Sequence, residues 1–111
     1  MSIINQDISK AETLPSRFYT DSETFENLRD CFASHWHFAA HISEFDDNTV
    51  IPLPHLEGLM KEPLVLTKDD EIRCLSNVCT HRGMLIANEK CTGSTLRCTY
   101  HGRTFGLDGC M

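Results

Sequence analysis

Two short segments of the chain each place one cysteine close to one histidine. The first reads CTHRG at residues 79–83 and the second reads CTYHG at residues 98–102, with sixteen residues between the two Cys/His pairs. Thiolates and imidazoles are common ligands of zinc and iron in proteins. A glycine follows each histidine closely, which lets the backbone turn tightly and approach a cofactor. The candidate ligands are Cys79, His81, Cys98 and His101.

Two kinds of metal site use this donor set. One is a tetrahedral zinc ion in a structural module. Zinc fingers with two Cys and two His usually supply the cysteines as one pair and the histidines as another, whereas each segment here supplies one of each. That pattern suits a Rieske 2Fe-2S centre, in which one iron takes both thiolates and the other takes both imidazoles. Colour separates the alternatives, because the iron centre is red-brown and a zinc site is colourless.

Histidine ligands also change the charge of such a cluster. Two ferric ions, two sulfides and two thiolates sum to zero, whereas four thiolates would leave two negative charges. The neutral core accepts an electron more readily. Rieske potentials accordingly span about −150 to +300 mV, against about −400 mV for plant-type clusters.

The bulk composition limits the class of protein. With 111 residues the chain forms one small domain, and its formal net charge of −6 argues against nucleic acid as a partner. No apolar run is long enough for a membrane span, and residues 1–10 lack the apolar stretch of a secretory signal. The sequence therefore predicts a cytoplasmic protein without a membrane partner, whose six cysteines bind metal or stay as free thiols rather than form disulfides.

Helical and strand patterns follow one another along the chain. After a polar arm, a helix is predicted over residues 22–34, capped by Asp21 or Ser22. Its apolar stripe is predicted to form core packing and comprises Phe25, Leu28, Phe32 and Trp36. Strands are predicted at 37–42, 49–53, 63–67, 72–76, 95–98 and 104–107, with turns at 68–71 and 108–109. This pattern indicates a small all-β sandwich or barrel.

The two ligand segments resemble the cluster motifs of the Rieske non-haem iron oxygenases, the large (alpha) subunits of aromatic ring-hydroxylating dioxygenases. That family carries Cys-x-His-Arg-Gly in one loop and Cys-x-Tyr-His-Gly-Trp in the other. Residues 77–78 and 104–109 also fit the family, and the layout of 19–36 is similar to its leading helix and Trp-led strand. One residue departs from the pattern, because Arg103 stands where the family usually has Trp.

The resemblance implies a mainly β fold. This is a Rieske iron-sulfur domain, a small antiparallel β-sandwich with a cluster-binding subdomain of two loops, preceded by an N-terminal helix. Residues 1–35 would form the arm and helix, and 36–111 the 2Fe-2S domain. The turn at 108–109 should lead into another strand, so we expect a piece of a longer polypeptide with a catalytic domain after it.

The function implied by the resemblance is electron transfer within an oxidoreductase. The cluster would accept an electron from a ferredoxin or a flavin/iron-sulfur reductase. It would pass the electron to a mononuclear non-haem Fe(II) in the downstream domain, so no catalytic residue is expected in this chain. The family's large subunits often form trimers, which implies a homo-oligomer. The alternative is a stand-alone Rieske ferredoxin, which the leading helix disfavours, and a structural zinc module is less favoured still.

The residues around the ligands receive assignments from the same resemblance. Those expected next to the cluster are Arg82, Gly83, Tyr100 and Gly102, together with Thr80 and Thr99. High-potential Rieske proteins carry a disulfide at the positions of Met84 and Tyr100, so this chain resembles the low-potential type.

The remaining cysteines, histidines and acids are expected to serve structure. Cys31 and Cys74 are predicted to be buried free thiols, whereas Cys91 and Cys110 are predicted to be exposed. Structural roles are predicted for His35, His37, His41 and His55. The acidic pairs at 46–47 and 69–70 are predicted to be solvated rather than catalytic.

Overall fold

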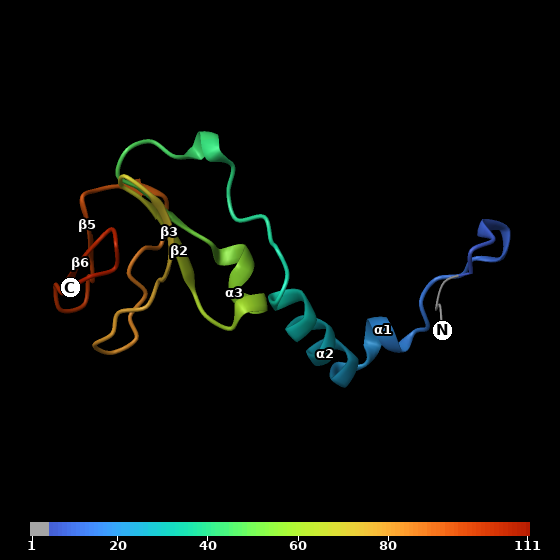
Figure 1. The fold of residues 1–111 in the computed structure, drawn as a ribbon. Helices are drawn as coiled ribbons and strands as arrows, with labels where there is room; N and C mark the ends of the chain where they lie inside the picture. Colours follow the sequence, from blue (N-terminus) through green and yellow to red (C-terminus); the bar gives the residue numbers. More distant parts are fainter. Residues whose placement is uncertain (1–4) are drawn as a thin grey trace. The chain divides into compact units, whose positions relative to one another are not determined.

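The computed structural model describes residues 5–111, which divide after Trp36 into two compact units. The first unit is helical, and the second contains the strands (Figure 1). No helix among the described residues is both long and apolar enough to cross a membrane.

The first unit contains the predicted helix. It comprises the 3-10 turn η1 (Ile8–Lys10) and the helices α1 (Arg17–Thr20) and α2 (Ser22–Ala33). The Asp21 carboxylate accepts a hydrogen bond of 2.7 Å from the Thr24 N–H and so satisfies one free donor at the start of α2. The Thr24 side chain first, and then the Thr24 N–H, lower the pKa of Asp21, so the cap keeps its charge at neutral pH. The cap residue and the bounds of α2 confirm the helix predicted over 22–34.

The apolar stripe of α2 is exposed within the first unit. Phe25 is 61% exposed and Phe32 is 57% exposed, and no residue of α2 is buried. The first unit consists of one helix of three turns with short flanking segments, and such a unit has no second layer to cover an apolar face. Packing of this stripe into a core therefore stays a prediction.

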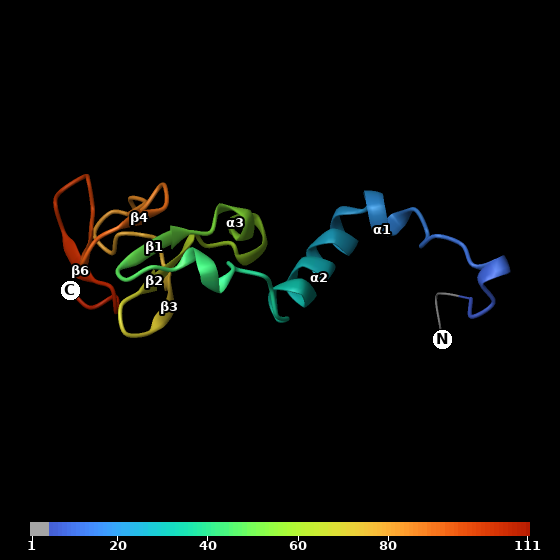
Figure 2. The ribbon, with the colours of Figure 1, turned by 90° about the horizontal axis from the view of Figure 1, so that it is seen from above.

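The second unit is built on antiparallel strands, which confirms the mainly β fold (Figure 2). One sheet has the order β3-β2-β1-β4, and a second pairs β5 with β6. The strand bounds are β1 (Thr49–Pro52), β2 (Leu64–Lys68), β3 (Ile72–Ser76), β4 (Cys91–Thr92), β5 (Thr95–Arg97) and β6 (Thr104–Gly106). The patterns at 49–53, 63–67, 72–76, 95–98 and 104–107 thus predicted real strands, whereas the short edge strand β4 was missed.

The predicted turn at 68–71 joins β2 to β3. The Asp69 carboxylate accepts the Glu71 N–H at 3.0 Å and also contacts the Arg73 guanidinium. These two interactions, the backbone hydrogen bond first, lower the pKa of Asp69. The carboxylate therefore stabilises the turn as an anion.

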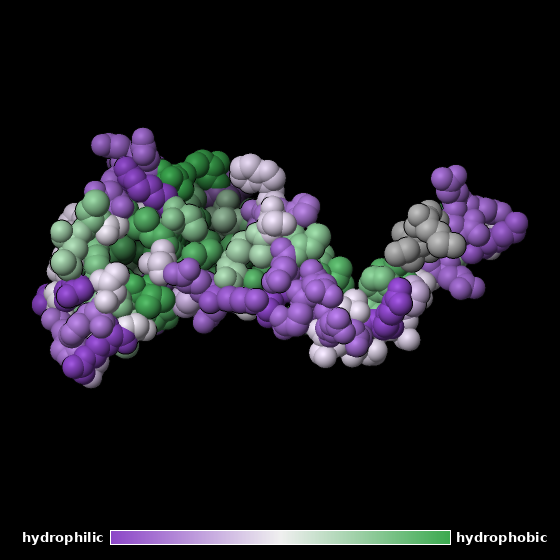
Figure 3. All heavy atoms as spheres, turned by 60° about the horizontal axis from the view of Figure 1, so that its bottom comes forward, coloured by the Kyte–Doolittle hydropathy of each residue, from purple (hydrophilic) through white to green (hydrophobic). Residues whose placement is uncertain are grey.

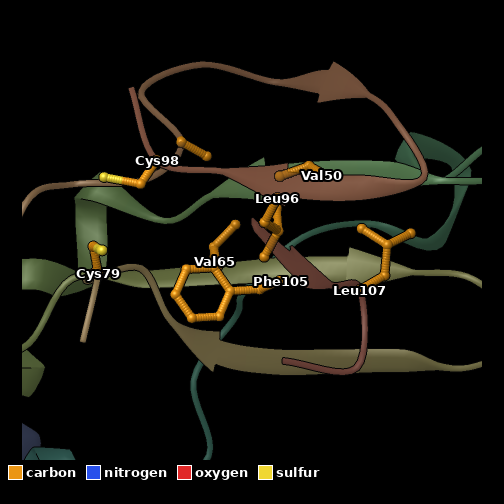
Figure 4. Close-up of a cluster of buried hydrophobic side chains, with 8 residues drawn as sticks. Val50, Val65, Cys79, Leu96, Cys98, Phe105 and Leu107 are labelled. Atoms are coloured by element: carbon orange, nitrogen blue, oxygen red, sulfur yellow. The ribbon is translucent and has the colours of Figure 1, made fainter. Parts of the chain in front are cut away.

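Strand alternation separates two hydrophobic clusters on the two faces of the sheet. Val50 and Val65 point into one cluster, and their neighbours Ile51 and Leu66 point into the other. The first cluster also holds Cys79, Ala87, Leu96, Cys98, Phe105 and Leu107 (Figure 4). Some hydrophobic surface remains on this unit, bordered by hydrophilic residues (Figure 3).

A short helix, α3 (Pro54–Met60), covers the other face of the sheet and was not predicted. Pro54 occupies its first turn, where the missing N–H costs nothing, and Lys61 ends it in a left-handed conformation with φ 59°. Leu56 is buried in the second cluster. The helix has only seven residues, with Gly58 in its interior, so its periodic signal is weak.

The strand predicted at 37–42 does not form. His41 instead begins the 3-10 turn η2 (Ile42–Glu44) with a reciprocal cap. Its ring nitrogen accepts the Ser43 N–H at 3.2 Å, and the Glu44 carboxylate accepts the His41 N–H at 3.0 Å. Local side-chain hydrogen bonds to the backbone therefore prevail over the weak strand pattern.

Replacing Thr67 by Val should destabilise the second unit. The Thr67 hydroxyl is fully buried and donates a 2.7 Å hydrogen bond to the Leu107 carbonyl, joining β2 to the segment after β6. Loss of that donor leaves a buried carbonyl unpaired, so the free energy of unfolding should fall by about 1–3 kcal/mol in urea titration. The control Thr95→Val, at an exposed strand position, should change it by less than about 0.5 kcal/mol. Equal effects of the two substitutions would contradict a structural role for this hydrogen bond.

Candidate metal centre

Loop 1 (residues 79–84) is a tight turn held by its own backbone. The Cys79 N–H donates to the Met84 carbonyl at 2.8 Å, and the Gly83 N–H donates to the Cys79 carbonyl at 3.0 Å. Gly83 has φ 70°, a left-handed conformation that glycine adopts without strain. The sequence requirement for glycine at this position follows from that angle.

Loop 2 (residues 98–103) repeats the same hydrogen bonds. The Cys98 N–H donates to the Arg103 carbonyl at 2.8 Å, and the Gly102 N–H donates to the Cys98 carbonyl at 2.9 Å. Gly102 has φ 75°. Both loops therefore hold their cysteine by the same pair of backbone hydrogen bonds. The histidine, however, comes two residues after Cys79 and three residues after Cys98.

Each loop stands on a rigid stem. Loop 2 connects the paired strands β5 and β6. Loop 1 is closed by Asn77, whose buried side-chain amide donates to the Ala87 carbonyl at 2.7 Å and accepts the Ala87 N–H at 2.8 Å. An isolated bridge between Val78 and Leu85 lies above this pair of hydrogen bonds. The stems fix where the two cysteines enter the first hydrophobic cluster.

The four candidate ligands meet as two like pairs. Cys79 and Cys98 are each 2% exposed, lie at the same end of the first cluster (Figure 4) and approach within hydrogen-bonding distance of each other. His81 and His101 are exposed, and their ring centroids lie 4.8 Å apart at an interplanar angle of 64°. The thiols thus face the core, and the imidazoles face solvent.

The surroundings of Cys98 favour its thiolate. The Tyr100 backbone N–H is the main cause of a pKa below the ordinary value for this thiol. The His101 N–H, the Cys79 thiol and the Arg103 guanidinium lower the pKa further, against the opposing effect of burial. A thiolate is the form that binds metals, so the loop prepares this residue for coordination.

This arrangement fits two inequivalent metals better than one. Across residues 5–111, no three side chains of the types His, Cys, Asp and Glu converge tightly enough to hold a single ion. A tetrahedral zinc site needs all four donors around one point. A centre with one iron on two thiolates and the other on two imidazoles needs the separate pairs that the structure shows.

The comparison with protein families agrees with this donor pattern. The family model for the Rieske [2Fe-2S] domain matches residues 35–111. This chain belongs to the Rieske [2Fe-2S] domain family. Its cofactor is therefore the 2Fe-2S cluster.

Proteins with similar sequences include oxygenase subunits. The Rieske chain is 36% identical over 104 residues to the carnitine monooxygenase oxygenase subunit of Escherichia coli (strain K12), covering 90% of this chain and 27% of that protein. It is 32% identical over 120 residues to the methanesulfonate monooxygenase hydroxylase subunit alpha of Methylosulfonomonas methylovora, covering 92% of this chain and 27% of the relative. The chain thus spans about a quarter of these relatives' length.

Solved structures show the same fold. The quaternary ammonium Rieske monooxygenase CntA in complex with L-carnitine matches with TM-score 0.77 and 33% identity, over 88% of this chain and 28% of that one. Naphthalene 1,2-dioxygenase from Rhodococcus sp. matches with TM-score 0.71 and 30% identity, over 85% and 22%. The Rieske fold predicted from the sequence is confirmed.

The cysteines outside the two loops are all exposed. Cys91 and Cys110 were predicted to be so. The prediction of burial was wrong for Cys31 and Cys74. Cys74 lies on the edge strand β3, whose residues alternate between half-buried and exposed, and Cys31 lies on α2, which buries no residue.

Three of the spare histidines make structural hydrogen bonds. A His35 ring nitrogen lies 2.6 Å from the Cys31 carbonyl at the end of α2, and a His55 ring nitrogen lies 3.3 Å from the Phe38 carbonyl. His41 caps η2. These contacts confirm the structural roles predicted for the three residues.

Some residues beside the site could be predicted, and others could not. The Tyr100 ring lies 3.8 Å from the His101 ring, as centroids, whereas Arg82 is exposed and makes no side-chain hydrogen bond or ion pair within residues 5–111. The Asn77 clamp was missed, although an amide side chain two positions before a ligand is a signal for it. Arg97 was also missed, and its guanidinium lies over the Gly102 backbone.

The left-handed angle at Gly83 can be tested against a matched glycine. A methyl group at Gly83 or at Gly58 would meet no atom within 4 Å, but only Gly83 has a positive φ. Gly83→Ala should therefore lower the free energy of unfolding by about 1 kcal/mol. Gly58→Ala, inside α3, should raise it by about 0.5–1 kcal/mol. Urea titration measures both, and a stabilising Gly83→Ala would refute the requirement for glycine at this left-handed position of loop 1.

Proposed function

We propose that Cys79 and Cys98 bind one iron of the cluster and that His81 and His101 bind the other. The sorting of the donors into a buried thiol pair and an exposed imidazole pair is the observation that carries this assignment. The spacing of each loop and the preparation of Cys98 as a thiolate support it.

The arrangement suits transfer of single electrons. The bound cluster supplies a centre that is reduced and oxidised by one electron. Burial of the thiols in the first hydrophobic cluster keeps water away from one side of the site, and tight backbone loops limit movement of the ligands between oxidation states. The exposed His81 and His101 form the side of the site from which an electron reaches a partner.

We further propose that the chain acts as the Rieske part of an oxygenase alpha subunit. In this organisation residues 1–35 lead into the Rieske domain at 36–111, and a separate domain holds the mononuclear non-haem iron. A ferredoxin or flavin/iron-sulfur reductase would donate the electron. The carnitine and methanesulfonate monooxygenase relatives support this over a stand-alone ferredoxin, because both are subunits of oxygenases. One solved structure of a relative is described as giving insight into inter-subunit electron transfer, which supports an oligomer, and the homo-oligomeric trimer stays a prediction.

Two finer assignments stay predictions. The relatives include carnitine monooxygenases as well as a 2-aminobenzenesulfonate 2,3-dioxygenase, so their names support an oxygenase without selecting ring hydroxylation. The cytoplasmic location rests on the sequence pattern alone.

Substitution of either histidine tests the ligand assignment. His81→Ala and His101→Ala should each abolish the cluster, because one iron would lose half of its protein ligands. Iron, acid-labile sulfide and the visible spectrum of the reconstituted chain measure the loss. The control His55→Ala changes an exposed histidine outside the loops and should retain two irons and two sulfides per chain. A full Rieske spectrum from either ligand variant would refute the assignment.

A further inference from the structure

Arg103 connects the two loops. Its guanidinium donates a hydrogen bond of 3.0 Å from Nη1 to the Thr80 hydroxyl, which stands between Cys79 and His81 in loop 1. Within residues 5–111, no other side-chain hydrogen bond joins loop 1 to loop 2, apart from the approach of the two cysteine thiols. We call the Arg103–Thr80 contact the inter-loop hydrogen bond.

The backbone of Arg103 is fixed before its side chain reaches across. Its carbonyl accepts the Cys98 N–H at 2.8 Å, and strand β6 begins at the next residue. The guanidinium therefore extends from a fixed backbone position. Arg103 thus forms hydrogen bonds with Cys98 in loop 2 and with Thr80 in loop 1.

The charge of Arg103 is not neutralised locally. No carboxylate among residues 5–111 forms an ion pair with it, whereas Arg73 pairs with Asp69 and Glu71. Its positive charge instead acts on Cys98, in a chain with a formal net charge of −6. A tryptophan, the residue usual in the family, brings no charge to this position.

We propose that Arg103 is a positioning residue that holds the two cluster loops together through Thr80 and raises the reduction potential of the cluster by its charge. This inference rests on the proposed ligand set. Adding an electron makes the cluster more negative, so an uncompensated cation beside Cys98 stabilises the reduced state. The inter-loop hydrogen bond restrains loop 1 against loop 2 and so slows the opening that releases iron.

The effect of the charge is measured by redox titration of the complete, cluster-loaded chain. Arg103→Met removes the cation and keeps an apolar stem of similar length. It should lower the equilibrium constant for reduction by about tenfold, which corresponds to about 59 mV for a one-electron couple. Arg103→Lys keeps the charge and should stay within about twofold of the parent. An unchanged potential in Arg103→Met, or an equal shift in both variants, would overturn the charge effect.

The effect of the hydrogen bond is measured by cluster release to an iron chelator. Thr80→Val removes the hydroxyl and leaves Arg103 in place, so release should become about fivefold faster, as expected for one lost hydrogen bond. Thr99→Val is the matched control, because Thr99 follows Cys98 as Thr80 follows Cys79 and makes no side-chain hydrogen bond within the described residues. Equal release rates in these two variants would overturn the restraint of loop 1.

The parent chain separates the proposed ligand set from the role of Arg103. A parent that takes up no 2Fe-2S cluster overturns the ligand set and this inference with it. A parent that loads normally, with variants that match it in potential and release rate, overturns only the role of Arg103. If Arg103→Met fails to bind the cluster, Thr80→Val still tests the inter-loop hydrogen bond, because Thr80→Val keeps every charged group.

Discussion

Two backbone hydrogen bonds at each cysteine are the constraint on which the rest of the site depends. In both loops the cysteine N–H donates to the carbonyl five residues later, and a glycine N–H returns to the cysteine carbonyl. Satisfying these groups locally lets a polar loop end inside an apolar cluster without unpaired donors. It also directs both thiols inward, so that one side of a cofactor is enclosed while the other stays accessible.

The histidines then decide what kind of cofactor the frame can hold. The histidine follows its cysteine by two residues in loop 1 and by three in loop 2. The two imidazole rings are both exposed, and their centroids lie 4.8 Å apart. A neutral cluster with imidazoles on its outer iron accepts electrons readily and exchanges them through that side. The β-sheet keeps two groups of apolar side chains apart. Alternating residues of its strands point either into the hydrophobic cluster that holds the cysteines or into the hydrophobic cluster that α3 covers. Arg103 modifies this scheme by adding a fixed cation where relatives usually carry an aromatic ring.

The sequence predicted best the features that depend on residues close together in the chain. The ligand motifs, the cap of α2 and the β2–β3 hairpin each depend on residues close together in the chain, and all were found. The failures depend on packing that a local pattern does not contain. Cys74 pairs with the buried Leu66 across the sheet, yet it lies on the edge strand β3 and is exposed. The Asn77 clamp and the inter-loop hydrogen bond join residues 10 and 23 positions apart, so neither appears until the loops are placed in space.

The central claim is that the two irons have different ligands, and Mössbauer spectroscopy of the oxidised chain, loaded with ⁵⁷Fe, tests it most directly. Isomer shift and quadrupole splitting report the donor atoms at each iron. The account predicts two quadrupole doublets of equal area, one from an iron bound by thiolates and one from an iron bound by imidazoles. A single doublet, from two irons in the same environment, would contradict it.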